Sequence, residues 1–228
     1  MEIFWHGLSF FQINGKINGE KISLVLNPFN KENISRPLKL QADITIFSSP
    51  SFLPSPKDLN DFIQDTFLIK GPGEYEVKRV QIRGIADSSG KLEKKDIVNN
   101  TIFQIKLEGI KMCHLGNLKE AQVSSEILEK IVGIDILFIP VGGDFTISGK
   151  EASRLVSQIE PKIAIPMNYI PSDKKNYFKI KGLKLGLGDE KDFLRALGIK
   201  TKEKTKKLKI KAEELQGNGT ELVLLELT

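Results

Sequence analysis

The sequence predicts a layered domain built from β-sheets and α-helices. In the first half of the chain, short runs rich in β-branched and aromatic residues alternate with turns containing Gly, Pro and Asn. In the second half, such runs alternate with stretches whose apolar residues recur at helical spacing. Strands followed by strand–helix alternation are typical of layered α/β architectures. The 228 residues contain no long polar linker, so we expect a single domain over residues 1–228.

The first half contains most of the predicted strands. An almost continuous apolar run covers residues 3–13, and Gly15 and Gly19 indicate a turn before the next run. We expect further strands at residues 22–26, 44–47, 67–69 and 80–85.

The second half contains the predicted helices. Residues 101–107 and 110–113 form a predicted hairpin, after which Ser148 and Glu151 have the spacing of a capping box. The helix that this box opens carries apolar residues at helical spacing up to residue 159. The other predicted elements are a helix over 123–131, strands at 134–141 and 162–165, and a short helix that ends at Gly198.

The C-terminal region has two β-rich segments, residues 206–212 and 221–227, which we expect to pair with each other around Gly217 and Gly219. Seven lysines crowd the first of these segments and the residues before it: Lys200, Lys202, Lys204, Lys206, Lys207, Lys209 and Lys211. Such a cluster is a candidate for binding nucleic acid or another polyanion. Because no aromatic residue lies among the lysines to stack on a base, a solvated lysine-rich strand is the simpler interpretation.

The composition excludes several classes of protein. No apolar run approaches the roughly 18 residues needed to cross a bilayer, so we expect no membrane association. The first residues lack a basic region followed by an apolar one, so no secretory signal is predicted. One cysteine, Cys113, excludes an internal disulfide and a cysteine-rich metal site. We therefore expect a cytoplasmic location.

Several motifs are shared with one enzyme superfamily. The most specific are residues 111–118 (KMCHLGNL), 163–169 (IAIPMNY), 71–77 (GPGEYEV), 135–143 (DILFIPVGG) and the opening 5–11 (WHGLSFF). Together they resemble the metallo-β-lactamase superfamily, in its small UlaG-like branch, where the first two motifs read C-H-L-G-D-L and I-P-M-H-Y. The resemblance implies an α+β fold, the αββα four-layer sandwich, in which helices cover two face-to-face sheets. In active members two divalent metals, usually zinc, activate a water that attacks an ester, amide or phosphoester.

The residues that the resemblance assigns to the metals are replaced in this chain. Asn117 stands for the bridging aspartate and Asn168 for the last histidine. In residues 48–54 (SSPSFLP), where the family has T/S-H-x-H-x-D-H, the expected ligands are also replaced. Leu8 stands for the opening histidine and Asn27 for an aspartate in a turn. With His114, these changes imply a former metal pocket lined by Ser49, Ser51, Leu53, Pro54, Asn117, Asn168 and His114, with no catalytic or metal-binding residue.

The histidine count supports this interpretation. The chain has only two histidines, His6 and His114, whereas a two-metal site of this superfamily uses several. Both have neighbours typical of structural histidines, and Cys113 lies in a predicted strand and is expected to be buried. Asp87, in the loop where the family has another histidine, is a weaker candidate for a cation ligand. Replacing Asp by Asn keeps the shape of a side chain and removes a charge whose burial without a metal would be costly.

Three hypotheses about function remain open. The first is a metal-free, hydrolytically inactive homologue that binds a small polar ligand or a protein partner. The second is a hydrolase with a non-standard site, in which a serine would need a positioned base such as His114. The third is a nucleic-acid-associated protein that uses the lysines of residues 200–211. The sequence identifies neither ligand nor partner, and a homo-oligomer is compatible with all three hypotheses.

Overall fold

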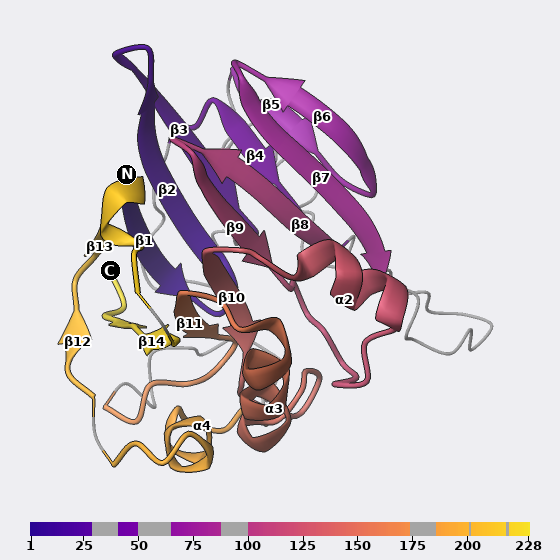
Figure 1. Cartoon of the computed structure of the whole chain (residues 1–228), viewed down its shortest axis with the longest axis vertical. Helices are drawn as coiled ribbons and strands as arrows, with labels where there is room; N and C mark the ends of the chain where they lie inside the picture. The colour runs from indigo at the N-terminus through magenta and orange to yellow at the C-terminus, as the bar shows by residue number, and fades with distance from the viewer. Residues whose placement is uncertain (29–40, 50–64, 88–99, 174–185, 201, 218) are drawn as a thin grey trace.

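Two β-sheets form the framework of the molecule in a computed structural model of the whole chain (Figure 1). The structure describes residues 1–28, 41–49, 65–87, 100–173, 186–200, 202–217 and 219–228. The first sheet has six strands in the order β13-β1-β2-β3-β4-β5. Its strands are β1 (Glu2–Gly7), β2 (Phe10–Ile17), β3 (Glu20–Leu26), β4 (Ile44–Ile46), β5 (Phe67–Ile69) and β13 (Leu208–Lys209).

The second sheet has seven strands in the order β14-β11-β10-β9-β8-β7-β6. Its strands are β6 (Gly73–Val77), β7 (Val80–Asp87), β8 (Asn100–Leu107), β9 (Ile110–His114), β10 (Ile136–Pro140), β11 (Ile163–Met167) and β14 (Glu221–Leu222). The strands β6 to β9 are antiparallel neighbours, whereas β9, β10, β11 and β14 run parallel. The change of direction follows the sequence, because tight turns join β6 to β7 and β8 to β9, whereas helices separate the later strands.

The described helices are α2 (Ser125–Ile131), α3 (Gly149–Ile159) and α4 (Lys191–Ala196), with a short 3₁₀ turn, η3 (Ala212–Glu214). The predicted capping box opens α3, since the Ser148 hydroxyl accepts from Glu151 N–H and the Glu151 carboxylate accepts from Ser148 N–H. Helix α3 contacts β10, and α4 packs on α3. Within the described residues, no helix is both long and apolar enough to span a membrane.

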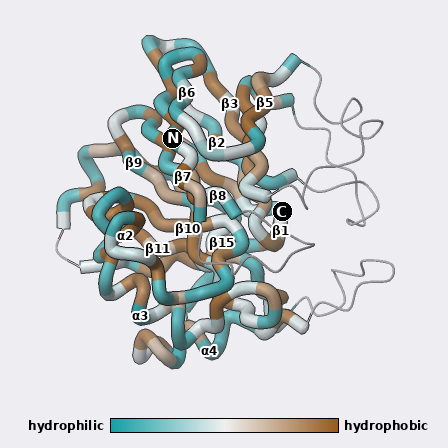
Figure 2. Tube along the Cα trace, turned by 90° about the vertical axis from the view of Figure 1, so that its right-hand side faces the viewer, coloured by the Kyte–Doolittle hydropathy of each residue, from teal (hydrophilic) through white to brown (hydrophobic). Residues whose placement is uncertain are grey.

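The core fills the space between the sheets. Phe11 of the first sheet meets Phe138 of the second with ring centroids 4.6 Å apart, and both rings are inaccessible to solvent. The hydropathy colouring of Figure 2 shows hydrophobic stretches along the strands of both sheets. Burying a side chain of this size contributes roughly 1.5–3 kcal/mol, so packing between the sheets dominates the stability of the fold.

The predicted C-terminal hairpin is wrong. Strand β13 pairs antiparallel with β1, and β14 pairs parallel with β11. The remaining segment, β12 (Lys204–Thr205), pairs parallel with β15 (Leu224–Leu225). Strand β13 therefore extends the open edge of the first sheet, and β14 extends that of the second. Burial of backbone groups at these two edges outweighs the formation of a local hairpin.

Candidate functional site

The candidate site lies where several parallel strands end. Strands β3 and β4 run parallel in one sheet, and β9, β10 and β11 run parallel in the other, so their carboxyl ends lie at one edge of each sheet. Two backbone contacts join these edges: Asn168 N–H donates to Leu8 O over 3.0 Å, and Thr101 N–H donates to Ser48 O over 2.7 Å. Polar residues that follow the strand ends are therefore brought together from distant parts of the sequence.

The structure places four of the seven predicted pocket residues. Ser49, His114, Asn117 and Asn168 are all buried. Ser51, Leu53 and Pro54 lie outside the described residues.

Asn117 and Asn168 are in direct contact. The Nδ2 atom of Asn168 donates to Oδ1 of Asn117 over 2.8 Å and makes a longer contact of 3.4 Å with Gly116 O. Asn168 has a left-handed backbone conformation, with φ of 53°, which asparagine adopts more readily than most residues. The two residues at which the resemblance implies metal ligands therefore bind each other through their amides.

Asn27 forms a second polar cluster beside this pair. Its Oδ1 accepts from Ser48 N–H over 2.7 Å, while its Nδ2 donates to Ser48 Oγ over 2.8 Å and to Ser9 Oγ over 3.1 Å. All of these groups are buried. Both ends of the Asn27 side chain are therefore satisfied by neighbours within the protein.

Asn100, the first residue of β8, binds the backbone of Asn117, a role that no sequence motif indicated. Its Oδ1 accepts from Asn117 N–H over 2.9 Å, and its Nδ2 donates to Leu115 O over 2.9 Å. The same Nδ2 lies 3.3 Å from Oδ2 of Asp87. The only sequence signal was a polar residue at the start of a predicted strand, which is too common to identify a site.

His114 is fully engaged by backbone groups. Its Nδ1 accepts from Gly116 N–H over 3.1 Å, so Nε2 carries the proton and donates to Ser9 O over 3.1 Å. Burial lowers the pKa of His114 to about 4, which keeps the ring neutral near pH 7. With both ring nitrogens occupied, His114 has no lone pair for a metal or for the proton of a serine hydroxyl.

Within the part of the chain that the structure describes, two buried polar atoms at the end of β11 have no hydrogen-bond partner: Oδ1 of Asn168 and the hydroxyl of Tyr169. The Tyr169 ring stacks on Trp5 with centroids 4.9 Å apart, and burial raises the pKa of its hydroxyl. An unsatisfied buried acceptor costs about 1–3 kcal/mol. The orphan carbonyl of Asn168 is therefore a position at which a ligand or water that donates a hydrogen bond would be stabilised.

The donor groups do not fit a dinuclear zinc site. Among the described residues, no group of three or more His, Cys, Asp or Glu side chains lies close enough to hold a metal ion. The second histidine, His6, contacts Thr228 and Gln12, at 3.2 Å from Thr228 O and 3.4 Å from Gln12 Oε1. Zinc in proteins is bound by imidazole, thiolate and carboxylate, whereas Asn117 and Asn168 present amides and both ring nitrogens of His114 are already hydrogen-bonded.

The lysine-rich segment is largely neutralised by carboxylates. Lys204 lies 2.6 Å from Asp173 and 3.4 Å from the buried Glu190, and Lys207 lies 2.7 Å from Glu2. Burial by itself would lower the pKa of Lys204, but the hydrogen bonds and negative charges of Asp173 and Glu190 raise it overall. Lys202 and Lys211 also have carboxylate partners within 4 Å. The seven lysines therefore do not form one continuous unpaired patch.

Comparison with known proteins agrees with the fold. A family model described as the Beta-lactamase superfamily domain matches residues 2–168. A metal-dependent hydrolase of Thermococcus onnurineus is 34% identical over 119 residues, and one of Pyrococcus abyssi is 32% identical over 121 residues. Each alignment covers 49% of this chain and 52% of the relative, so the chain spans about half the length of the curated relatives it matches.

A solved structure matches over a longer region. A protein of Thermotoga maritima, assigned as a zinc-dependent hydrolase of the metallo-β-lactamase superfamily, superposes with a TM-score of 0.71 and 26% identity. The superposition covers 99% of both chains. The two-sheet architecture that the sequence predicts is therefore confirmed.

Proposed function

The chain belongs to the beta-lactamase superfamily, and from this premise we propose that it binds a small polar ligand or a partner protein without hydrolysing it. Its relatives are named as metal-dependent hydrolases, so the proposal is a departure from the activity that their names describe. It concerns the pocket that contains Asn117 and Asn168.

One observation carries the proposal: the 2.8 Å hydrogen bond from Asn168 Nδ2 to Asn117 Oδ1. For both side chains to bind one metal, this bond would have to break and each would have to present an oxygen to the cation. Neutral amides are weak ligands for zinc compared with imidazole and carboxylate. The arrangement therefore favours a neutral pocket over a metal centre.

The same pocket retains hydrogen-bonding capacity for a ligand. Among the described residues, Oδ1 of Asn168 is a buried acceptor with no donor, and the Nδ2 group of Asn117 donates to no atom. A polar ligand that donates to Asn168 and accepts from Asn117 would satisfy both groups. Because a buried unsatisfied acceptor is costly, binding such a ligand would be favourable.

Metal analysis tests the proposal. Elemental mass spectrometry of protein purified without chelator should find far less than one zinc, iron or manganese ion per chain. After incubation with zinc or manganese, the protein should also show no ester or phosphodiester hydrolysis above the buffer rate. A stoichiometric dinuclear centre, or metal-dependent turnover, would refute the proposal.

A restored variant supplies the positive control. It combines six substitutions: Ser49→His, Ser51→His, Leu53→Asp, Pro54→His, Asn117→Asp and Asn168→His. We expect this variant to bind zinc, whereas a matched variant with only Asn117→Asp and Asn168→His should not, because a stable zinc site needs at least three protein ligands. Equal zinc content in the natural chain and the restored variant would contradict the assignment of these positions.

A further inference from the structure

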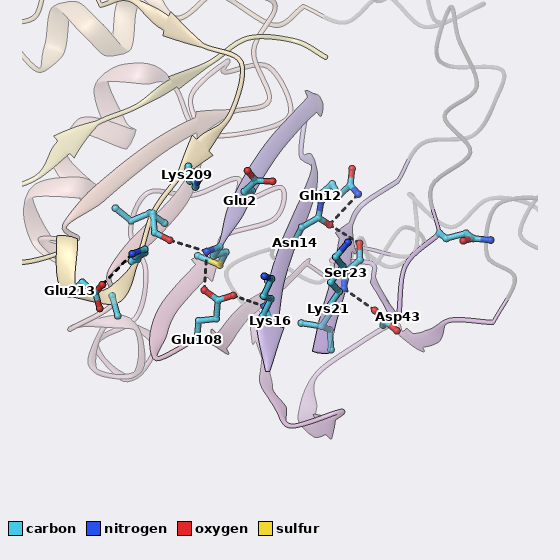
Figure 3. Close-up of a pocket in the computed structure, with 17 residues that line it drawn as sticks. Glu2, Gln12, Asn14, Lys16, Lys21, Ser23, Asp43, Glu108, Lys209 and Glu213 are labelled. Atoms are coloured by element: carbon cyan, nitrogen blue, oxygen red, sulfur yellow. Dashed lines mark hydrogen bonds and ion pairs between the residues drawn. The ribbon is translucent and has the colours of Figure 1, made fainter. Parts of the chain in front are cut away.

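A polar trough lies on the outer face of the first sheet, at the opposite end of β3 from the candidate site. The trough has a volume of about 970 Å³ and is bordered by β1, β2, β3 and the segment that contains β13 (Figure 3). On β3 the trough is lined by residues up to Ser23, whereas Asn27 of the candidate site follows the other end of the strand, roughly 13 Å farther along. The trough is therefore separate from the pocket of Asn117 and Asn168.

Strand alternation places the polar side chains of the trough. On β2, Ile13 is buried in the core, whereas Gln12, Asn14 and Lys16 lie on the other face. On β3, Lys21 and Ser23 line the trough in the same way. Figure 3 shows these side chains gathered on adjacent strands, with Lys209 and Glu2 beside them.

Among the described residues, four carboxylates line the trough, and each already has a partner: Glu2 pairs with Lys207 and Glu213 with Lys211. Glu108 accepts from Lys16 N–H over 2.5 Å through Oε1 and from the amino group of Met1 over 2.9 Å through Oε2. Asp43 accepts from Ser23 N–H over 2.8 Å and is paired with Lys78. Little acceptor capacity of these two side chains is left for a ligand.

Several hydrogen-bond donors of the trough, in contrast, have no acceptor among the described residues. Oδ1 of Asn14 accepts from Gln12 Nε2 over 3.2 Å and from Ser23 Oγ over 2.9 Å, so the Asn14 Nδ2 group is oriented as a donor. Within the described residues, this Nδ2 group has no acceptor. The ammonium groups of Lys16, Lys21 and Lys209 form no ion pair with any residue that the structure describes.

We propose that this trough binds a small anion with several acceptor oxygens, of the oligophosphate or phosphorylated small-molecule class. Three ammonium groups and the Asn14 amide supply donors, and phosphate oxygens are matching acceptors. The volume lies within the range of small-molecule sites, roughly 300–1,000 Å³. None of the described residues that line the trough is aromatic, which disfavours a single-stranded nucleic acid, because such strands are bound by stacking on aromatic rings.

Calorimetry with inorganic tripolyphosphate at low salt tests the proposal. We compare the natural chain with a variant in which the trough loses three charges, through Lys16→Gln, Lys21→Gln and Lys209→Gln. A matched variant carries Lys106→Gln, Lys200→Gln and Lys206→Gln, which removes the same charge at exposed lysines outside the trough. We expect a loss of affinity of roughly tenfold or more in the trough variant and a change of about twofold or less in the matched variant.

A single substitution tests the direction of the hydrogen bonds. Asn14→Asp replaces the donor group by a carboxylate oxygen, so tripolyphosphate binding should be lost while the three lysines remain. Thermal melting of each variant shows whether the fold is retained. In NMR spectra of the isotope-labelled natural chain, the side-chain amide resonances of Asn14 should shift when tripolyphosphate is added.

Three results would overturn the proposal. They are the absence of tripolyphosphate binding at low salt, equal losses of affinity in the two triple variants, and unchanged binding by a folded Asn14→Asp variant. A further titration uses a single-stranded oligonucleotide in place of tripolyphosphate. Oligonucleotide binding that is tighter than tripolyphosphate binding, and equally weakened in both triple variants, would assign the lysines to nucleic acid and also overturn the proposal.

Discussion

Gly116 lies at the centre of the candidate site, and its replacement by alanine is the most direct test of the packing there. The residue has a positive φ of 62°. A Cβ atom at this position would lie 2.1 Å from Oδ1 of Asn100 and 2.9 Å from Oγ of Ser48. Both atoms belong to buried side chains that hold the site together, so neither has free space into which to move.

The expected destabilisation has two parts. A left-handed backbone at a residue with a side chain costs about 1–2 kcal/mol. Displacing Asn100 also breaks its bonds to Asn117 N–H and Leu115 O, each 2.9 Å long. Leaving buried partners unsatisfied costs about 1–3 kcal/mol each, so we expect Gly116→Ala to lower the free energy of unfolding by about 3–8 kcal/mol in total.

Gly133→Ala is the matched control, because Gly133 also has a positive φ, 75°, but no atom lies within 4 Å of its ideal Cβ position. This variant should show the backbone cost alone, about 1–2 kcal/mol. Urea denaturation followed by circular dichroism measures both variants against the natural chain. If Gly116→Ala and Gly133→Ala lower the stability equally, the contact between Gly116 and Asn100 does not constrain the site as described.

Three further predictions concern buried groups and a helix cap. The pKa of His114 is lowered to about 4 from the usual 6.5, so the unfolded chain takes up a proton before the folded chain does. The folded state should therefore lose about 3 kcal/mol as the pH falls from 6.5 to 4. In His114→Gln this part of the pH dependence of urea denaturation should disappear, and an unchanged dependence would contradict the assignment. Cys113 is buried and its pKa is raised by burial, so the native protein should not react with a thiol reagent that labels the chain rapidly in urea. Fast labelling under native conditions would show that β9 opens readily. Ser148→Ala removes the capping box of α3 and should cost about 1 kcal/mol in thermal or urea denaturation, whereas Ser157→Ala in the last turn of the same helix should cost less.

Local patterns predicted most of the regular structure. The alternation of buried and exposed residues in β7, which the sequence shows as apolar residues at positions 80 and 82, is the period of a half-buried strand. The capping box of Ser148 and Glu151 was also predictable, because both partners lie within one helical turn. Signals of this kind need only neighbouring residues.

The partners of the C-terminal segments were not predictable in the same way. Strands β12, β13, β14 and β15 contain two residues each: β13 pairs with β1, β14 pairs with β11, and β12 and β15 pair with each other. Segments this short carry little pairing information of their own. Their partners are decided by which sheet edges remain open once the rest of the chain has folded.

By itself, the sequence determined the fold class and the chemistry available to this protein. Asparagines stand at positions 117 and 168, where the resemblance implies metal ligands, so the sequence places neutral amides at these two positions. Only the tertiary structure decided how those groups are used. It directs the Asn168 amide to Asn117, occupies both nitrogens of His114, and leaves the Asn168 side-chain carbonyl without a donor among the residues that the structure describes. The physical reason is that residue types set hydrogen-bonding capacity, whereas the meeting of distant strand ends decides which capacities are satisfied within the protein and which remain for a ligand.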